Sequence, residues 1–182
     1  MAKKGIFFLA FALSAFLAAS QDSRGGLIEG DGWAFLVSAP EGWVWDGTTL
    51  RLHGIRGLFY KAGTSYSASA LHIYISPTVK KPGEPASLAQ FISDDETSFM
   101  KTAPGIFEKD LPPYQAGPGY EYLLKDFDDS NANFYQTIGY YEGEAAYFIF
   151  VLSCRSPAER EAERPAFLEL LDSFTYVKKE KP

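Results

Sequence analysis

The segment from residue 120 to residue 153 constrains the fold most, because it holds three aromatic and apolar runs separated only by short polar turns. The runs are Tyr120–Phe127, Phe134–Tyr141 and Ala145–Ser153. Runs of this length and composition are typical of β-strands, and such short connections join antiparallel neighbours into a meander. The third run is apolar at successive positions, so it predicts a central strand that is covered on both faces.

Two helix-start signals flank this meander. Before it, Ser87 and Gln90 form a capping-box pair, which predicts a helix over residues 87–100. After it, Ser156-Pro157-Ala158-Glu159 combines a serine cap, a proline at the first helical position and a glutamate that can complete the box. Pro165 lies inside the second helical pattern and is expected to interrupt it and open a further helical segment, because an interior proline removes a backbone donor.

Shorter strands are expected in the first half of the chain and at its end. They span residues 33–39, 49–53, 58–61, 70–76 and 176–177. The segments 49–53 and 58–61 are expected to pair across a glycine-marked turn, and Pro77 is expected to end the strand 70–76. Together the elements predict an α+β fold, an α/β/α sandwich with a central, mostly antiparallel sheet and helices on both faces.

The first residues have the three zones of a secretory signal peptide. Lys3 and Lys4 precede an apolar run over residues 5–19, and the small residues Ala18 and Ser20 come before a polar stretch. The apolar run is shorter than the ~20 residues of a membrane-spanning helix, which favours a cleaved signal over a retained anchor. The expected product is exported, periplasmic or extracellular, with no stable membrane span after cleavage.

The expected boundaries follow from composition. Residues 1–20 form the signal peptide, and the glycine-rich stretch 21–32 predicts a flexible leader. One domain is expected over residues 33–178, with a short polar tail over residues 179–182.

Net charge excludes one class of partner, and cysteine content limits disulfide formation and lipid attachment. The formal net charge is −6, and loss of the basic signal makes the chain more acidic, so nucleic acid is not expected to bind. Cys154 is the only cysteine, so no intramolecular disulfide can form. Its position at the end of an apolar run predicts a buried and unreactive thiol. No cysteine lies beside the cleavage region to carry a lipid.

Few residues are available for catalysis. The chain has no G-x-S-x-G, H-E-x-x-H, Walker or C-x-x-C motif, which weakens an enzyme interpretation. His53 and His72 are the only histidines, so a secreted hydrolase with a histidine base would use one of them. If their strands were neighbours, the two imidazoles and a carboxylate would form a metal site. The alternative is two ordinary surface histidines.

Asp126, Asp128 and Asp129 gather carboxylates near a turn, which is the chemistry that calcium or another divalent metal requires. The segment departs from the EF-hand pattern. Asn131 stands where that loop needs glycine, and Thr137 stands where it needs a bidentate glutamate. Local hydrogen bonding in an Asx-rich turn is the alternative explanation, and otherwise no cofactor is expected.

Two short motifs carry a family resemblance. They are Pro40-Glu41-Gly42-Trp43 after a short strand, and the ending Pro165-x-Phe167…Leu171-x-Ser173-Phe174. These motifs and the order of the predicted elements resemble those of the PsbP-like superfamily, and the resemblance covers residues 33–177. The superfamily includes PsbP, the Ran-binding Mog proteins and DcrB-type envelope proteins. The resemblance implies an α/β/α sandwich and an accessory or binding role. It assigns no binding residue, and the chain differs from the DcrB type in lacking a lipidated cysteine.

These observations predict an exported, non-catalytic binding or accessory protein that serves a protein partner or small ligand in the cell envelope. The alternatives are a secreted hydrolase and a metal- or calcium-binding protein. A basic, deep cleft that holds His53 or His72 beside a carboxylate would favour the hydrolase. A flat or aromatic-lined surface would favour the binding role.

Overall fold

A computed structural model describes residues 24–30, 32–49, 54–81, 87–117 and 119–178. Its elements, in chain order, are β1 (Gly25–Gly30), β2 (Trp33–Ser38), β3 (Trp43–Asp46), β4 (Gly57–Lys61), the 3-10 helix η2 (Tyr66–Ala68), β5 (His72–Val79), α1 (Leu88–Thr102), β6 (Phe107–Asp110), β7 (Tyr114–Ala116), β8 (Tyr120–Asp129), β9 (Phe134–Glu142), β10 (Ala146–Cys154), α2 (Pro157–Ser173) and β11 (Thr175–Lys178).

The strands form one large and one small antiparallel sheet. The large sheet has the order β3-β4-β5-β10-β9-β8-β6, with β7 also paired to β8, and the small sheet has the order β1-β2-β11. The predicted meander is confirmed as β8-β9-β10. Strand β10 lies centrally, and all of its side chains except Ile149 are buried, as its apolar sequence predicts.

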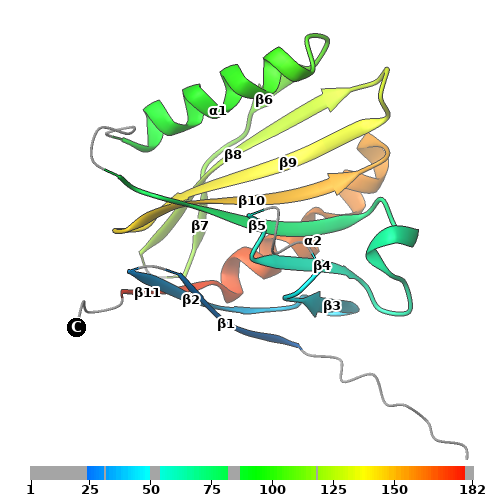
Figure 1. The fold of residues 1–182 in the computed structure, drawn as a ribbon. Coiled ribbons are helices and arrows are strands. Elements are labelled where there is room, and N and C mark those ends of the chain that lie inside the picture. The colour runs from blue at the N-terminus through cyan, green and yellow to red at the C-terminus, as the bar shows by residue number, and fades with distance from the viewer. Residues whose placement is uncertain (1–23, 31, 50–53, 82–86, 118, 179–182) are drawn as a thin grey trace, which may run out of the picture.

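The two helices cover opposite faces of the large sheet (Figure 1). Along β10, Phe148 and Phe150 point into the core beneath α2, whereas Tyr147 and Val151 point toward α1. Such alternation is the normal consequence of the two-residue period of a strand. The small sheet joins the α2 side, where Phe35 packs edge-on against Phe148. The α+β fold with helices on both faces is confirmed.

Both helix starts are confirmed by their caps. The Ser87 hydroxyl accepts from the Gln90 amide at 3.3 Å, and the Ser156 hydroxyl accepts from the Glu159 amide at 3.1 Å. The expected interruption at Pro165 is wrong, because α2 continues through it as one helix. Burial of Phe167, Leu170 and Leu171 from the second half of the helix offsets the lost backbone hydrogen bond.

Residues 25–30 do not belong to a flexible leader, because they form β1 and pair along their whole length with β2. The glycines that suggest flexibility instead permit close packing. A Cβ on Gly26 would lie 2.5 Å from the Trp45 ring, and one on Gly30 would lie 2.1 Å from the Trp33 ring. Because glycine has no side chain, the indole rings can pack directly against the backbone of β1.

Strand β5 also runs beyond its expected end at Pro77. The Arg56 amide donates to the Ile75 carbonyl, so the backbone polar groups of Ile75 face β4. The backbone of Pro77, two residues later, faces the same side. Gly57, the first residue of β4, pairs with Ile75, so no residue of β4 lies opposite Pro77. No ladder donor is needed at that position, so proline is accommodated there.

The two neighbours of β4 are β3 and β5, so the expected pairing of residues 58–61 with residues 49–53 is wrong. Residues 50–53, with His53, lie outside the described part of the chain, as does the expected signal peptide. Across the residues that the structure describes, no helix is long and apolar enough to cross a membrane.

Candidate binding pocket

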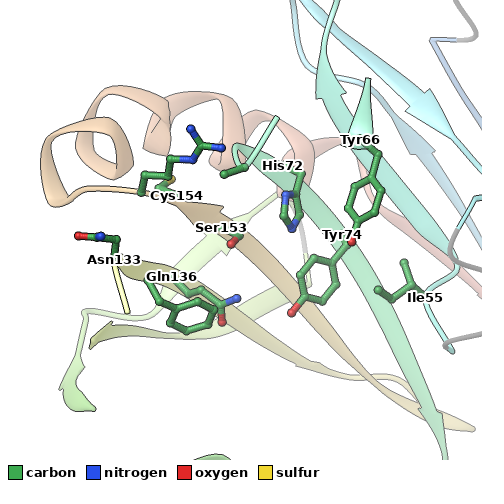
Figure 2. Close-up of a pocket in the computed structure, with 11 residues that line it drawn as sticks. Ile55, Tyr66, His72, Tyr74, Asn133, Gln136, Ser153 and Cys154 are labelled. Atoms are coloured by element: carbon green, nitrogen blue, oxygen red, sulfur yellow. The ribbon is translucent and has the colours of Figure 1, made fainter. Parts of the chain in front are cut away.

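A row of three polar side chains crosses the α1-facing side of the large sheet. His72 on β5 lies directly opposite Ser153 on β10, and Ser153 lies directly opposite Gln136 on β9. Directly opposite residues point to the same face, with Cβ atoms about 5 Å apart. Figure 2 shows Ser153 between His72 and Gln136, facing a pocket of about 410 Å³.

Aromatic rings frame this row. Tyr66 of η2 meets the His72 ring edge-on with centroids 5.4 Å apart, and Tyr74 stacks on the same imidazole with centroids 5.9 Å apart. Phe134 lines the pocket from β9. The pocket exists because α1 covers the neighbouring part of this face, where Phe91 stacks on Tyr147, and leaves this end of the sheet open.

The imidazole of His72 is neutral, a form that can both donate and accept a hydrogen bond. Burial lowers the pKa of its imidazole, and the backbone carbonyl of Ala70 opposes the shift only in part. The ring is therefore neutral at pH 7. Its Nδ1 atom is buried and has no hydrogen-bond partner of normal geometry among the described residues.

None of the described residues that line the pocket carries a carboxylate. Besides the neutral polar row they include Asn133 and Arg155. Burial raises the pKa of Tyr74 to about 12, and the side chain of Gln136 opposes that shift, so the phenol stays protonated at neutral pH. The wall is thus polar, aromatic and neutral, with one guanidinium at its edge.

Cys154 follows Ser153 on β10 but its side chain belongs to the α2-side core. It is 3% exposed, and burial, aided by the charge of Glu159, raises the pKa of its thiol to about 12. The predicted burial of this thiol is confirmed. Cys154 also lines the pocket wall, but its buried and protonated thiol is not a nucleophile.

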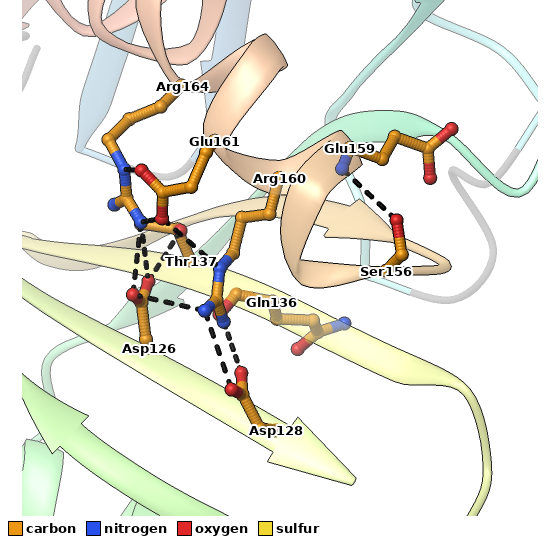
Figure 3. A network of polar contacts seen from close by, with 9 residues as sticks. All are labelled: Asp126, Asp128, Gln136, Thr137, Ser156, Glu159, Arg160, Glu161 and Arg164. Carbon is orange, nitrogen blue, oxygen red and sulfur yellow. Dashed lines mark hydrogen bonds and ion pairs between the residues drawn. The ribbon is translucent and has the colours of Figure 1, made fainter. Parts of the chain in front are cut away.

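Two of the three carboxylates proposed for calcium instead bind arginines of α2 (Figure 3). Asp126 accepts from Arg164 at 3.0 Å and from the Thr137 hydroxyl at 2.7 Å. Arg160 pairs with Asp128 and lies 3.4 Å from Asp126. The guanidinium groups occupy the positions that a cation would need.

Asp129 does not join them. Its carboxylate accepts from the backbone amides of Asn131 and Ala132 at 3.0 and 3.2 Å, as an ordinary Asx turn does. Strand alternation places Asp126 and Asp128 on the α2 side and turns Asp129 away from them. Within the described ranges, no three His, Cys, Asp or Glu side chains are arranged to hold a metal ion.

The structure also decides what can lie beside His72. Its neighbours on the two sides are Tyr60 of β4 and Ser153 of β10, so β5 has no free edge there for a strand carrying His53. His53 itself is among the residues that the structure does not describe. The sequence alone did not identify three residues of the pocket, Ser153, Gln136 and Tyr66. They come together only through the pairing register of the strands, which the sequence did not determine.

Comparison with known proteins supports the fold and leaves the site unassigned. No protein-family profile and no curated protein matches the sequence. The solution structure of cyanobacterial PsbP (CyanoP) from Synechocystis sp. PCC 6803 is similar, with a TM-score of 0.54 and 12% identity over 87% of this chain and 96% of that one.

A crystal structure from Bacteroides thetaiotaomicron VPI-5482 is also similar, with a TM-score of 0.50 and 11% identity over 87% of this chain. This chain spans 50% of the length of that protein. Identities this low show the fold alone, which is PsbP-like.

Proposed function

We propose that the protein is an exported, non-catalytic binding or accessory protein that holds its ligand, free or presented by a partner in the envelope, in the pocket around His72. The observation that carries the proposal is the neutral row His72, Ser153 and Gln136, framed by Tyr66 and Tyr74. Convergent polar groups in an aromatic concavity are the usual composition of a ligand site. The resemblance to a superfamily of accessory proteins supports the same class of role.

A hydrolase is the second candidate, because Ser153 stands directly opposite His72. A serine nucleophile needs a histidine that is oriented by an acceptor at its other nitrogen, normally a carboxylate. Within the described part of the chain, no carboxylate lines the pocket and Nδ1 of His72 has no hydrogen-bond partner of normal geometry. The arrangement is better suited to hydrogen bonding a ligand than to activating a serine.

The test fills the pocket without removing its polar groups. Ala70 lines the pocket, so Ala70→Phe is expected to occupy it. Ala158→Phe makes the same change on the exposed first turn of α2 and is the control. After equilibrium dialysis against small molecules extracted from the envelope, the wild-type and control proteins should enrich the same compound, and Ala70→Phe should not.

Equal enrichment by Ala70→Phe, or none by the wild type, would contradict the proposed site. A parallel hydrolase screen tests the rival function. Activity that is lost in Ser153→Ala and His72→Ala, with both variants folded by circular dichroism, would replace the binding proposal with an enzyme.

A further inference from the structure

We infer that the ligand is a small organic anion with a planar, aromatic body, an inference that rests on the proposed function of the pocket. It is drawn from the position and the free state of Arg155, from the rings that surround His72, and from the neutral groups between them.

Among the described residues that line the pocket, Arg155 is the one cationic side chain, since His72 is neutral. It is exposed, and among the described residues its guanidinium makes no hydrogen bond or ion pair. Arg160 and Arg164, on the helix that follows, are both paired with Asp126. Of these three arginines, only Arg155 has its planar donors free for a carboxylate, sulfonate or phosphate.

The local charge favours an anion although the whole chain does not. The formal net charge is −6, yet the described residues of the pocket wall include one guanidinium and no carboxylate. Near the start of α2 the Glu159 amide donates to the Ser156 hydroxyl and the Arg155 amide donates to the Glu159 carboxylate, so neither of these amides is free for a ligand. Charge recognition therefore depends on the Arg155 side chain.

The body of the ligand is defined by the rings. Tyr66 and Tyr74 present aromatic surface beside His72, and Phe134 adds another ring to the wall. Flat aromatic ligands pack well against such surfaces in offset or edge-to-face arrangements. A pocket of about 410 Å³ accommodates one or two rings.

Neutral polar groups line the floor between the rings and the arginine. Ser153 and Gln136 are buried, and a neutral imidazole both donates and accepts hydrogen bonds. A hydroxyl or ring nitrogen on the ligand would pair with this row. Inorganic phosphate lacks the planar body and would leave the aromatic wall unused.

The experiment uses matched probes on the isotope-labelled exported protein, followed by amide chemical shifts. The probes are 4-hydroxybenzoate, its neutral amide 4-hydroxybenzamide, and inorganic phosphate. The carboxylate should perturb residues 72–74, 134–136 and 153–155 and bind at least about tenfold more tightly than the amide, because it gains a charge-assisted hydrogen bond. Phosphate should bind more weakly than the carboxylate.

Two variants assign the preference. Arg155→Gln should bind the acid and the amide equally, whereas Arg24→Gln, which removes another exposed arginine away from this pocket, should keep the difference. Equal binding of acid and amide by the wild type, binding of neither, or a preference that survives Arg155→Gln would overturn the anion assignment. Those results leave the dialysis test of the pocket itself unaffected.

Discussion

The two faces of the large sheet are built from alternating residues of the same strands, yet they differ in how they are closed. The α2 face is sealed by α2 and the small sheet, with Phe148, Phe150 and Phe174 packed together. The α1 face has a single covering helix, anchored by Phe91 and Ile92. Its uncovered end is where the pocket lies.

The difference fits the proposed division of roles, in which one face stabilises the fold and the other binds a ligand. On the α2 face, Arg160 is an internal cation that is 6% exposed and bound to Asp126 and Asp128. The α1 face has an internal ion pair of its own, since Lys125 of β8 lies 2.5 Å from Glu96 of α1. On the α1 face, Arg155 is exposed and unpaired within the described residues. One face uses its arginine to join a helix to the sheet, and the other leaves an arginine available to a ligand.

The largest expected difference between the faces is in thiol reactivity. At pH 8, Cys154 should react with a maleimide at least about a thousandfold more slowly than an unfolded peptide thiol, because burial raises the pKa of its thiol to about 12 and blocks access. In a Cys154→Ala background, Ser153→Cys places a thiol one residue away on the pocket side and should react faster. Rapid labelling of native Cys154 would show that the α2 face opens.

Removing one ring from each face should give unequal losses of stability. Phe150→Ala, at a fully buried position, should lower the free energy of unfolding by about 3–5 kcal/mol. Phe91→Ala, whose site is closer to solvent, should cost about 2–3 kcal/mol. Guanidinium denaturation measures both. Equal losses would mean that α1 closes its face as tightly as α2 does.

Most of the fold was readable from the sequence, because periodicity and capping act locally. The meander and both helix starts follow from residues within a few positions of one another. The errors concern features that packing decides. Gly26 and Gly30 resemble a leader until Trp45 and Trp33 are placed against them, and Pro165 resembles a helix break until the face beyond it is buried.

The candidate site was less predictable than the fold, because it too depends on contacts between residues far apart in the sequence. His72 was recognised as a functional candidate, but its neighbours come from β10 and β9 and depend on strand register. Asp126 and Asp128 were recognised as a cluster, but the sequence did not show that Arg160 and Arg164 would reach them from α2. Long-range pairing determines which chemistry a local motif performs.

The arginines of the two faces can be compared directly. Arg160→Met should destabilise the protein by about 2–3 kcal/mol, because it leaves Asp128 without its partner and weakens the pairing of buried Asp126. The value is below that of a fully buried pair since Asp128 is 29% exposed. Arg155→Met should change stability by less than about 0.5 kcal/mol. A similar loss in both variants, measured by thermal and denaturant unfolding, would contradict the proposed division of roles.

The smallest expected effect concerns one of the polar contacts between α1 and the sheet. Tyr140 donates to the Asp95 carboxylate at 2.9 Å, and burial raises the pKa of Asp95, an effect that this hydrogen bond only partly offsets. An acid whose pKa is higher in the folded state than in the unfolded state binds its proton more tightly when folded. Its contribution to stability therefore grows as the pH falls through the folded pKa and is diminished at neutral pH.

Asp95→Asn keeps an oxygen acceptor for Tyr140 and removes the buried charge. At pH 7 the variant should be as stable as the wild type or more stable by up to about 1 kcal/mol, and this difference should vanish on acidification toward pH 4. Asp94→Asn, an exposed neighbour on the same helix, makes the same change in net charge and should show no such convergence. Urea unfolding at several pH values measures both. A clear loss of stability at pH 7 in Asp95→Asn alone would mean that the charge of Asp95 itself stabilises the packing of α1 on the sheet, in addition to the ion pair between Glu96 and Lys125.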